Sequence, residues 1–443
     1  MTQLEAIGFM LSGRNVFLTG PPGCGKSYVI DSFIRHISGV KIVALTATTG
    51  ISANLIGGIT IHSWAAMGFN RSGPDKLPLA IKERIRETQI LIIDEISMLA
   101  PDSLDYLNRL LKTVRSDERA FGGIQVILSG DFFQLPPVGK SAKSYAFQAR
   151  AWSELNLTIC YLSEQHRQRQ DELYELLCAL RERRFERRYL DLLLSRRQPA
   201  SDKEITTLLT HNTEVEKINC YRLSSLNGQS RSYCMHSGGQ ADALAVLKKS
   251  ILAPEQLQLK IGAKVMFVAN NMDQGYVNGS QGRVVGFSRG WPVVKLADSE
   301  KLITVEAYKW HYDLNGKLLA EVYQLPLKLS WAITIHKCQG MSLDRAVIDL
   351  SRSFTYGMGY VALSRLKSYQ GLYLKGINTR SLLLDPKVYD FDKSIKGQID
   401  PYAASSTAQW VQALFEAGAS REFIRLCLGL SAVQLRRLLA SKS

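Results

Sequence analysis

The chain contains 443 residues, and its 55 Lys and Arg against 40 Asp and Glu give a formal net charge of +15. This length predicts two to four domains, because one domain usually takes about 100–200 residues. Hydrophobic residues form 46% of the chain, which excludes a disordered protein. No apolar run approaches the ~18 residues that span a bilayer, and no secretion signal is visible at the N-terminus. We therefore expect a soluble intracellular protein that is not secreted: cytoplasmic in a bacterial or viral setting, nuclear or mitochondrial in a eukaryote.

The positive charge is spread along the chain. Its largest share, +7, falls within residues 261–398, and there is no basic tail. A diffuse excess is typical of a protein that holds a polyanion along a groove. A basic enzyme without such a partner stays open at this point.

The 7 cysteines do not indicate a disulfide framework, because none forms a C-x-x-C pair and the count is odd. Cys220, Cys234 and His236 lack the spacing of a common zinc module. We expect no structural metal from these residues.

Short apolar runs alternate with longer amphipathic segments in the first third of the chain. Near-continuous apolar runs are typical of parallel strands that are buried on both faces. The pattern predicts a doubly wound α/β domain over residues 1–160, with a small wedge-like insertion at about 64–85. The predicted strands are Val16–Thr19, Ile42–Leu45, Ile90–Ile93 and Ile124–Leu128, and the predicted helices are Ser27–Ile37 and Asp102–Val114.

A second α/β region is predicted over residues 161–259 and 326–395, with one long charged helix over Asp171–Leu194. Residues 260–325 change character, since short strands with turns between them predict a small inserted β-barrel. The predicted strands of this insertion are Lys264–Ala269, Gly282–Phe287, Val293–Leu296 and Leu302–Glu306.

The tail, residues 396–443, contains two short amphipathic segments between Trp410 and Leu439. Ser431 is placed to cap the second of them. The pattern is equally compatible with a helix-turn-helix and with a helical pair that docks on the rest of the protein.

Residues 20–27, Gly-Pro-Pro-Gly-Cys-Gly-Lys-Ser, match the phosphate-loop pattern between a predicted strand and a predicted helix. Backbone N–H groups of such a loop and the helix N-terminus surround a phosphate group. Lys26 can reach the β- and γ-phosphates, and the Ser27 hydroxyl can bind Mg²⁺. We therefore predict a nucleoside triphosphate and Mg²⁺ site, and the family resemblance described below implies that the nucleotide is ATP. Its nucleotide-contacting residues are Gly20, Gly23, Cys24, Gly25, Lys26, Ser27 and Tyr28.

Polar residues end two later strands of the same domain. Asp94 and Glu95 follow the run Ile90–Ile93, and Gln134 follows the next predicted strand. A carboxylate beside a phosphate loop can hold Mg²⁺, so Asp94 joins Ser27 as a predicted metal ligand. Glu95 can polarise the attacking water, and Gln134 can contact the γ-phosphate.

These motifs and several others occur in one order along residues 13–392, and together they resemble helicases of the petite-integration-frequency (Pif) type. This is a 5′→3′ branch of superfamily one that includes RecD-like enzymes. The matching segments are Thr19–Ser27, Thr46–Ala53, Gly57–Ser63, Asp94–Met98, Phe121–Gln125, Gly130–Pro137, His166–Gln168, Val277–Ser280, Ile335–Leu343 and Tyr360–Arg365. The resemblance implies two RecA-like P-loop NTPase domains and an ATP-dependent DNA helicase. Its expected setting is DNA repair, recombination, replication or telomere maintenance.

The resemblance also implies roles for residues outside the phosphate loop. Gln3 lies where such enzymes carry a glutamine that reads adenine; a solvated N-terminal glutamine is an equally open reading. Arg167 and Arg365 match two arginines that reach the γ-phosphate, where a guanidinium offsets developing charge.

Contacts to single-stranded DNA are implied for a further group of residues. Small hydroxyls and backbone amides suit phosphate contacts that read no base. Trp64, Phe69 and Phe133 could stack on bases or separate strands, although Trp64 is equally compatible with the core. Cys338 stands where relatives usually have serine, and a thiol is a poor hydrogen-bond donor. The implied backbone contacts are Thr49, Gly50, His62, Ser63, His336 and Lys337.

The expected partners are single-stranded DNA and forked or tailed duplex DNA, with four-stranded guanine structures as an open further substrate. We expect a monomer that does not bind membranes. An RNA-directed or protein-displacing translocase is the first alternative, since only contacts to a 2′-OH separate RNA from DNA at a given site. A binding module with a degenerate ATP switch is the second. Against it stand the intact Lys26, Glu95, Gln134, Arg167 and Arg365.

Overall fold

The computed structural model divides into two compact units. Unit 1 consists of Met1–Thr48, Ile56–Gln168 and Leu384–Ser443, and unit 2 of Thr49–Leu55 and Arg169–Leu383. Within the described ranges, no helix is long and apolar enough to cross a bilayer. The structure describes residues 1–67, 77–137, 144–164, 171–198, 204–271, 273–314, 317–397, 415, 421, 424, 425 and 431–440.

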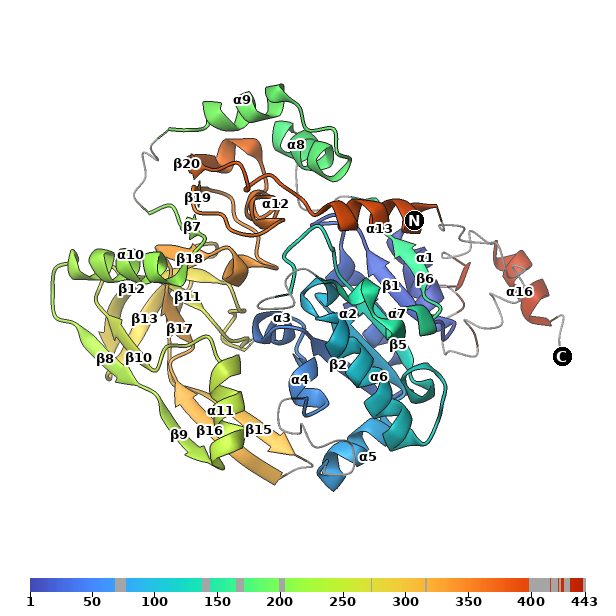
Figure 1. Cartoon of the computed structure of the whole chain (residues 1–443). Coiled ribbons are helices and arrows are strands. Elements are labelled where there is room, and N and C mark those ends of the chain that lie inside the picture. The colour runs from blue at the N-terminus through green and yellow to red at the C-terminus, as the bar shows by residue number, and fades with distance from the viewer. Residues whose placement is uncertain are drawn as a thin grey trace. The chain divides into compact units, whose positions relative to one another are not determined.

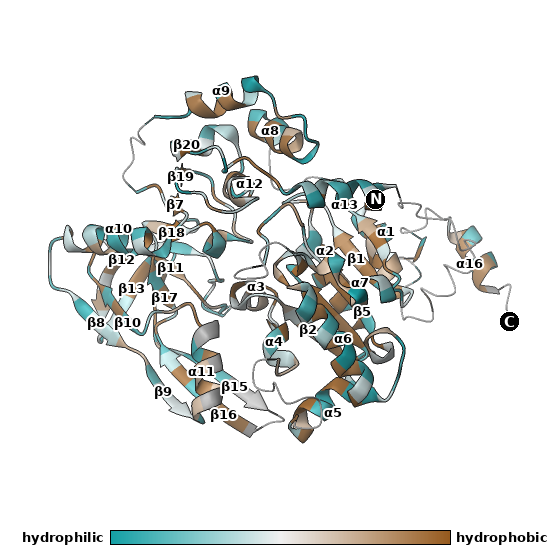
Figure 2. Cartoon of the chain, viewed as in Figure 1, coloured by the Kyte–Doolittle hydropathy of each residue, from teal (hydrophilic) through white to brown (hydrophobic). Residues whose placement is uncertain are grey.

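Unit 1 is built on a parallel sheet with the strand order β3-β2-β4-β5-β1-β6. Its central strands are fully buried and appear as hydrophobic ribbons in Figure 2. The four strands predicted for this domain are confirmed, with shifts of no more than two residues at their ends. The strands are β1 (Val16–Thr19), β2 (Val43–Ala47), β3 (Ile59–Thr60), β4 (Ile90–Asp94), β5 (Gln125–Ser129) and β6 (Thr158–Tyr161).

The helices of unit 1 begin and end at recognisable local signals. Helix α1 has a capping box, because Thr2 caps it and the Glu5 side chain accepts a hydrogen bond from the Thr2 N–H. Helix α6 starts with Pro101, a residue favoured in the first turn. The helices are α1 (Gln3–Leu11), α2 (Lys26–Ile37), α4 (Ile61–Trp64), α5 (Leu79–Glu87), α6 (Pro101–Arg115), α7 (Arg150–Glu154), α13 (Pro386–Lys396) and α16 (Ala432–Ala440).

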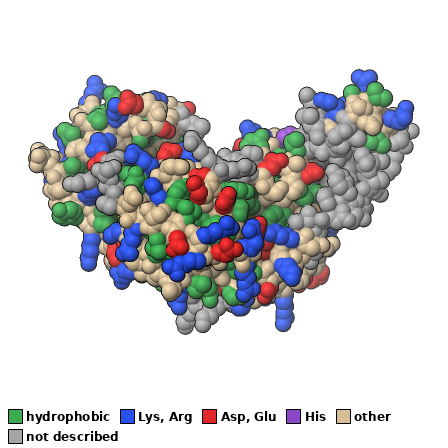
Figure 3. Space-filling view, turned by 90° about the horizontal axis from the view of Figure 1, so that it is seen from above, with side chains coloured by type: hydrophobic (Ala, Val, Ile, Leu, Met, Phe, Trp, Pro, Cys, Tyr) green, Lys and Arg blue, Asp and Glu red, His purple; other side chains and the backbone are tan. Residues whose placement is uncertain are grey.

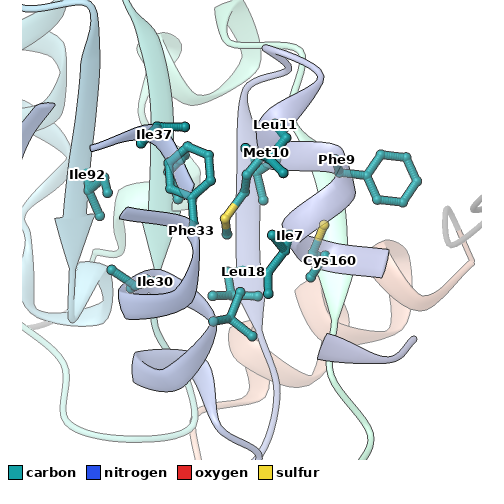
Figure 4. Packing of buried hydrophobic residues seen from close by; sticks show 14 of the residues in the cluster. Ile7, Phe9, Met10, Leu11, Leu18, Ile30, Phe33, Ile37, Ile92 and Cys160 are labelled. Atoms are coloured by element: carbon teal, nitrogen blue, oxygen red, sulfur yellow. The ribbon is translucent and has the colours of Figure 1, made fainter. Parts of the chain in front are cut away.

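The main core of unit 1 lies between helices α1 and α2 and the sheet. Figure 4 shows Phe33 and Ile37 of α2 beside Met10 and Ile7 of α1, over Leu18 of β1. All of these side chains are nearly inaccessible to solvent. This core fixes the strand and the helix between which the phosphate loop runs.

Helix α13 packs into unit 1, although the sequence placed residues up to 395 in the second α/β domain. The Phe391 ring stacks on Phe147, with centroids 4.1 Å apart, and it also contacts Phe17, Phe132 and Trp152. Aromatic pairs of this kind add to the free energy gained from burial alone. The end of the second domain therefore differs from the predicted boundary by the length of α13.

The described part of the tail docks on unit 1. Ile424 and Leu435 are 0% and 4% exposed, and both belong to the core that contains α1, α2 and β1. Ser431 caps α16 as predicted: its hydroxyl accepts from the Gln434 N–H (3.2 Å), and its own N–H donates to Gln434 Oε1 (2.8 Å). The burial of Ile424 and Leu435 favours docking of the tail over the helix-turn-helix.

Unit 2 contains a second parallel sheet, with the order β18-β7-β19-β20. Figure 1 shows its strands beside α12 (Met358–Leu363) and α10 (Asn212–Ser224). The strands are β7 (Thr207–Leu209), β18 (Ala332–Thr334), β19 (Ala346–Leu350) and β20 (Leu372–Ile377).

The prediction of one long helix over Asp171–Leu194 was wrong. The structure has two helices, α8 (Glu172–Arg181) and α9 (Arg187–Ser195). Arg183 between them has a φ of +57°, a left-handed conformation that a continuing helix does not contain. Asp171 caps α8, since its carboxylate accepts from the N–H groups of Leu173 and Tyr174.

The inserted β-region of unit 2 forms three antiparallel sheets. The first sheet has five strands in the open order β14-β13-β12-β11-β17, which differs from the small β-barrel that we expected. The second sheet has the order β15-β16-β9 and packs against α11 (Ala241–Ser250). The third sheet pairs β10 with β8. The region also begins earlier than predicted, at β8. The strands are β8 (Arg231–Cys234), β9 (His236–Gly239), β10 (Gln256–Leu259), β11 (Lys264–Phe267), β12 (Gln281–Ser288), β13 (Trp291–Leu296), β14 (Leu302–Thr304), β15 (Tyr308–Leu314), β16 (Lys317–Gln324) and β17 (Leu327–Leu329).

Candidate nucleotide site and nucleic-acid contacts

The phosphate loop of unit 1 connects β1 to α2 and needs glycine at defined positions. Gly20 has a φ of +147°, and a Cβ there would lie 2.5 Å from the carbonyl oxygen of Leu162. Gly25 caps α2 in the left-handed conformation, with a φ of +89°. This backbone turns the loop directly into the N-terminus of a helix, the geometry that binds phosphate.

Lys26 and Gln3 both contact this loop. Lys26 Nζ donates to the carbonyl oxygens of Gly20 (2.9 Å) and Pro21 (3.1 Å). Gln3, the first residue of α1, donates from Nε2 to the carbonyl of Cys24 (3.2 Å). The structure therefore brings Gln3 to the loop. Ser27 and Tyr28 lie exposed in the first turn of α2, and Cys24 is buried.

Asp94 lies at the carboxyl end of β4, beside the end of β5. In the sheet register Ala47 faces Asp94, and Ser129 of β5 faces Leu18 of β1. Burial raises the pKa of the Asp94 carboxyl, while the Ser129 hydroxyl, the Glu95 backbone and the Lys26 ammonium oppose this rise. A buried carboxylate close to the phosphate-loop lysine fits a Mg²⁺ ligand, because the ion's charge would offset the cost of burying the anion.

Glu95 adopts a strained backbone conformation, with a φ of +54°. For a residue with a Cβ, the left-handed region costs roughly 1–2 kcal/mol. Thr48 stabilises this turn, since its hydroxyl donates to the Glu95 carbonyl (2.8 Å) and its N–H donates to the Asp94 carbonyl (3.1 Å). Strain of this kind concentrates at functional sites. Sequence reasoning gave Thr48 no role, although it lies inside the Thr46–Ala53 motif.

Gln134 lies in a tight turn that follows β5. Its N–H donates to the carbonyl of Asp131 (3.0 Å), and the Asp131 carboxylate accepts from the Phe133 N–H (3.2 Å). Phe133 is 2% exposed, so its ring belongs to the core and does not offer a face to a base. We use the name nucleotide edge for the phosphate loop, Asp94, Glu95 and Gln134 at the carboxyl ends of β1, β4 and β5.

Of the two predicted arginines, the structure describes only Arg365. Arg365 belongs to unit 2, where its Nε donates to the Val361 carbonyl (3.1 Å) and its Nη2 to Ser364 Oγ (2.8 Å). Arg167 lies outside the described residues. The roles of both arginines stay predictions.

Helix α4 carries the predicted DNA contacts of unit 1. Thr60 caps this helix: its hydroxyl accepts from the Ser63 N–H (3.2 Å) and donates to Ser63 Oγ (2.8 Å). His62 is exposed, as a contact with the DNA backbone requires. Trp64 is 2% exposed and belongs to the core, so its predicted role in base stacking is not supported. Phe69 lies outside the described residues.

Two predicted contact segments lie close together within unit 2. Thr49 caps α3 (Gly50–Leu55), because its hydroxyl accepts from the Ser52 N–H (3.2 Å). A Cβ added to Gly340 would lie 2.7 Å from Leu55 Cδ1, so α3 approaches the segment that follows Lys337. Gly50 thus begins a helix, capped by Thr49, whose last residue approaches Gly340.

The turn after β18 carries His336, Lys337 and Cys338. The His336 ring lies against Phe354 (6.1 Å between centroids, 15° between planes), and burial together with nearby His211 lowers the pKa of His336. Lys337 is exposed. Cys338 Sγ donates to the Ile335 carbonyl (3.1 Å), so the thiol bonds within its own turn.

Lys328 is a candidate that sequence reasoning missed. It lies on β17 opposite Met266, and burial together with nearby Lys337 lowers its pKa to about 8. A cation this strongly desolvated, next to a second cation, favours an anionic partner. The only sequence signal was a charge between two leucines of a strand. We call His336, Lys337 and Lys328 the basic turn.

Comparison with known proteins gives the family. The chain matches the PIF1-like helicase family over residues 3–186 and the 2B domain of DNA helicase Pif1 over residues 243–287. The ATP-dependent DNA helicase Pif1 of Psychrobacter sp. is 38% identical over 89% of this chain and 71% of its own length. The chain spans 63% of the matching human relative. This protein belongs to the PIF1-like helicase family.

Solved structures agree with this assignment. The Pif1 helicase of Candida albicans has a TM-score of 0.78 at 34% identity, and the match covers 89% of this chain and 98% of that one. Bacteroides Pif1 in complex with ADP-AlF3 and ssDNA has a TM-score of 0.66 at 31% identity, and the match covers 88% and 95%. The predicted fold class, with two RecA-like domains, is confirmed. The 2B match falls on α11 and on strands β10 to β12 of the inserted region.

Proposed function

We propose that this protein is an ATP-dependent DNA helicase that moves 5′→3′ on single-stranded DNA and unwinds duplex DNA. The observation that carries the proposal is the nucleotide edge, where a glycine-shaped phosphate loop, a buried carboxylate and a strained glutamate meet at one edge of a parallel sheet. Membership in the PIF1-like family supports DNA as the track. So does the relative solved with ADP-AlF3 and ssDNA.

The residues of the nucleotide edge suit ATP hydrolysis. Lys26 would exchange its bonds to the Gly20 and Pro21 carbonyls for phosphate oxygens. Glu95 would orient and polarise the attacking water, and Gln134 would contact the γ-phosphate. Ser27 and Asp94 would hold Mg²⁺, which when bound neutralises charge on the phosphate oxygens. We assign adenine recognition to Gln3, and charge stabilisation at the γ-phosphate to Arg167 and Arg365.

The proposed DNA contacts are mostly sequence-independent. In unit 1 they are His62 and Ser63. In unit 2 they are Thr49, Gly50 and the basic turn. Hydroxyls, amides and ammonium groups of this kind bind phosphates without reading bases. Figure 3 shows Lys and Arg side chains interspersed with acidic ones over one face, in keeping with a diffuse excess of positive charge. We therefore expect weak sequence preference and strong salt dependence.

Unwinding of matched 5′-tailed and 3′-tailed duplexes tests the proposal. With ATP and Mg²⁺ present, the 5′-tailed substrate should be unwound and the 3′-tailed one should not. A requirement for a 3′ tail would overturn the polarity. ATP hydrolysis that does not respond to single strands would overturn the coupling to a nucleic-acid track.

An RNA-directed or protein-displacing translocase is the alternative. Side-by-side stimulation of the ATPase by single-stranded DNA and RNA of the same sequence separates the first of these from a DNA helicase. Streptavidin displacement from a biotinylated strand that carries no duplex tests the second. We expect DNA to stimulate more strongly than RNA.

We further propose a role in DNA repair, recombination, replication or telomere maintenance, action as a monomer, and a location wherever the host keeps its DNA. Four-stranded guanine structures are a further proposed substrate. Sedimentation with and without DNA tests the monomer. Unfolding of a 5′-tailed guanine quadruplex, compared with a duplex of equal stability, tests the substrate.

A further inference from the structure

Helix α1 is buried on more sides than the sheet and α2 can cover. Six consecutive residues, Ala6–Leu11, are all buried. A helix with apolar residues around its whole circumference needs a neighbour on every side. Figure 4 shows Ile7 and Met10 pointing toward the sheet, and Phe9 pointing away from Leu18 and Phe33.

Side chains of the tail belong to the same core as α1. Phe9 is only 4% exposed, and its core cluster also contains Ile424 and Leu435. Leu438 and Leu439 of α16 pack against the same cluster. The Arg14 guanidinium, 5.6 Å from the Phe9 ring, adds a polar edge. Residues more than four hundred positions apart therefore complete one core.

The body of α1 is thus covered by the tail, while its first residue contacts the nucleotide edge. Gln3 Nε2 donates to the Cys24 carbonyl inside the phosphate loop. An α-helix of nine residues is a short rigid rod, so a shift of its body moves its first residue. A change in the core that α1 shares with the tail should therefore also move the Gln3 amide.

We propose that the tail, through Ile424, Leu435, Leu438 and Leu439, holds α1 in place and thereby positions Gln3 on the phosphate loop. The tail thus sets how tightly and how selectively the adenine nucleotide binds. Gln3 contacts the nucleotide, and Leu435 is a positioning residue that acts through α1. This inference rests on the proposed role of Gln3 in adenine recognition.

The test compares DNA-stimulated hydrolysis of ATP and GTP by Gln3→Ala, Leu435→Ala and the double variant, in the full chain. We expect each single variant to raise the KM for ATP by roughly three- to tenfold, about the contribution of one hydrogen bond, and to lower the preference for ATP over GTP. The kcat at saturating ATP should stay near the wild-type value. The double variant should lose no more selectivity than Gln3→Ala alone, because both changes remove the same contact.

Val433→Ala is the matched control, since Val433 lies on the same helix and is 67% exposed. It should leave the KM and the selectivity unchanged. Should Leu435→Ala fail to fold, Leu438→Ala provides a milder change at a partly buried position of the same cluster.

Three outcomes decide the inference. Loss of selectivity in both single variants without additivity supports it. Loss in Gln3→Ala alone, with Leu435→Ala only less stable to heat, overturns it and leaves the nucleotide role of Gln3 intact. Unchanged selectivity in Gln3→Ala overturns both the inference and the role of Gln3, whereas the ATPase assignment is judged separately by Lys26→Ala.

Discussion

The nucleotide edge of unit 1 and the basic turn of unit 2 are built in different ways. At the nucleotide edge, backbone conformation fixes each group: Gly20, Gly25 and Glu95 all have positive φ, and Asp94 is buried at a strand end. In the basic turn, side chains from different elements carry the charge, and Lys337 is exposed. Transfer of a phosphoryl group needs groups held at fixed positions. Single-stranded DNA that moves along the protein needs positive charge nearby but no fixed position for each phosphate.

The largest effect is expected from Lys26→Ala. Loss of the ammonium should reduce ATP hydrolysis by about 10³-fold or more, because Lys26 Nζ lies on the loop carbonyls of Gly20 and Pro21, where it can reach the phosphates. Binding of single-stranded DNA should remain measurable by fluorescence anisotropy. Lys41→Ala, outside the loop, is the control. Retained turnover would show that the nucleotide edge is wrongly assigned.

Glu95→Gln should slow hydrolysis by about 10²–10⁴-fold while ATP binding survives. The amide keeps the size and the turn of the glutamate but cannot act as a base. Single-turnover hydrolysis and binding of a fluorescent ATP analogue separate the two effects. A variant that hydrolyses ATP at the wild-type rate would show that the Glu95 carboxylate does not activate the water.

Lys337→Ala tests the basic turn of unit 2. We expect affinity for single-stranded DNA to fall only about three- to tenfold, with the slope of log K against log salt smaller by about 0.7. The KM for ATP without DNA should not change. Equal loss of affinity at all salt concentrations would argue against a phosphate contact.

The smallest effect concerns Lys328 and pH. Its pKa is about 8 in the folded protein and lies near 10.5 in the unfolded chain. Between these values the unfolded chain binds more protons, so this group should make stability rise as pH increases from 8 to 10.5. Lys328→Met should stabilise the protein at pH 7 by on the order of 1 kcal/mol, a figure reduced for the partial exposure of the side chain to water. The variant should also show a smaller increase of stability between pH 8 and 10.5. Thermal unfolding at pH 7, 8.5 and 10 measures both, with Lys217→Met, at an exposed position of α10, as the control.

Sequence reasoning found the nucleotide edge because its features are local. The glycines, Lys26 and Asp94 follow strands whose apolar runs are visible in the sequence, and β1 has the predicted bounds. No local pattern pointed to Gln3: the family resemblance suggested its role, and the fold brings it to the loop from a separate segment.

The features that sequence reasoning missed depend on tertiary packing. The break at Arg183 is a single backbone conformation that composition does not reveal. Helix α13 follows unit 2 in the chain but packs its aromatic face on Phe17 and Phe132. The sequence was equally compatible with Trp64 in the core and with Trp64 in contact with DNA. Its burial in the structure shows that it belongs to the core. The desolvation of Lys328 requires neighbours that come from other elements.

The return of the chain to unit 1 after Leu383 has a consequence for biosynthesis. Phe391, Ile424 and Leu435 complete the core of the unit that Val16 and Leu18 begin. During synthesis on the ribosome, therefore, the aromatic residues and the α1 surface of the first RecA-like domain stay exposed until all of unit 2 has been synthesised. Domains generally fold as units, and exposed apolar surface on incomplete domains promotes aggregation. The nascent chain should therefore depend on chaperones until α16 has emerged.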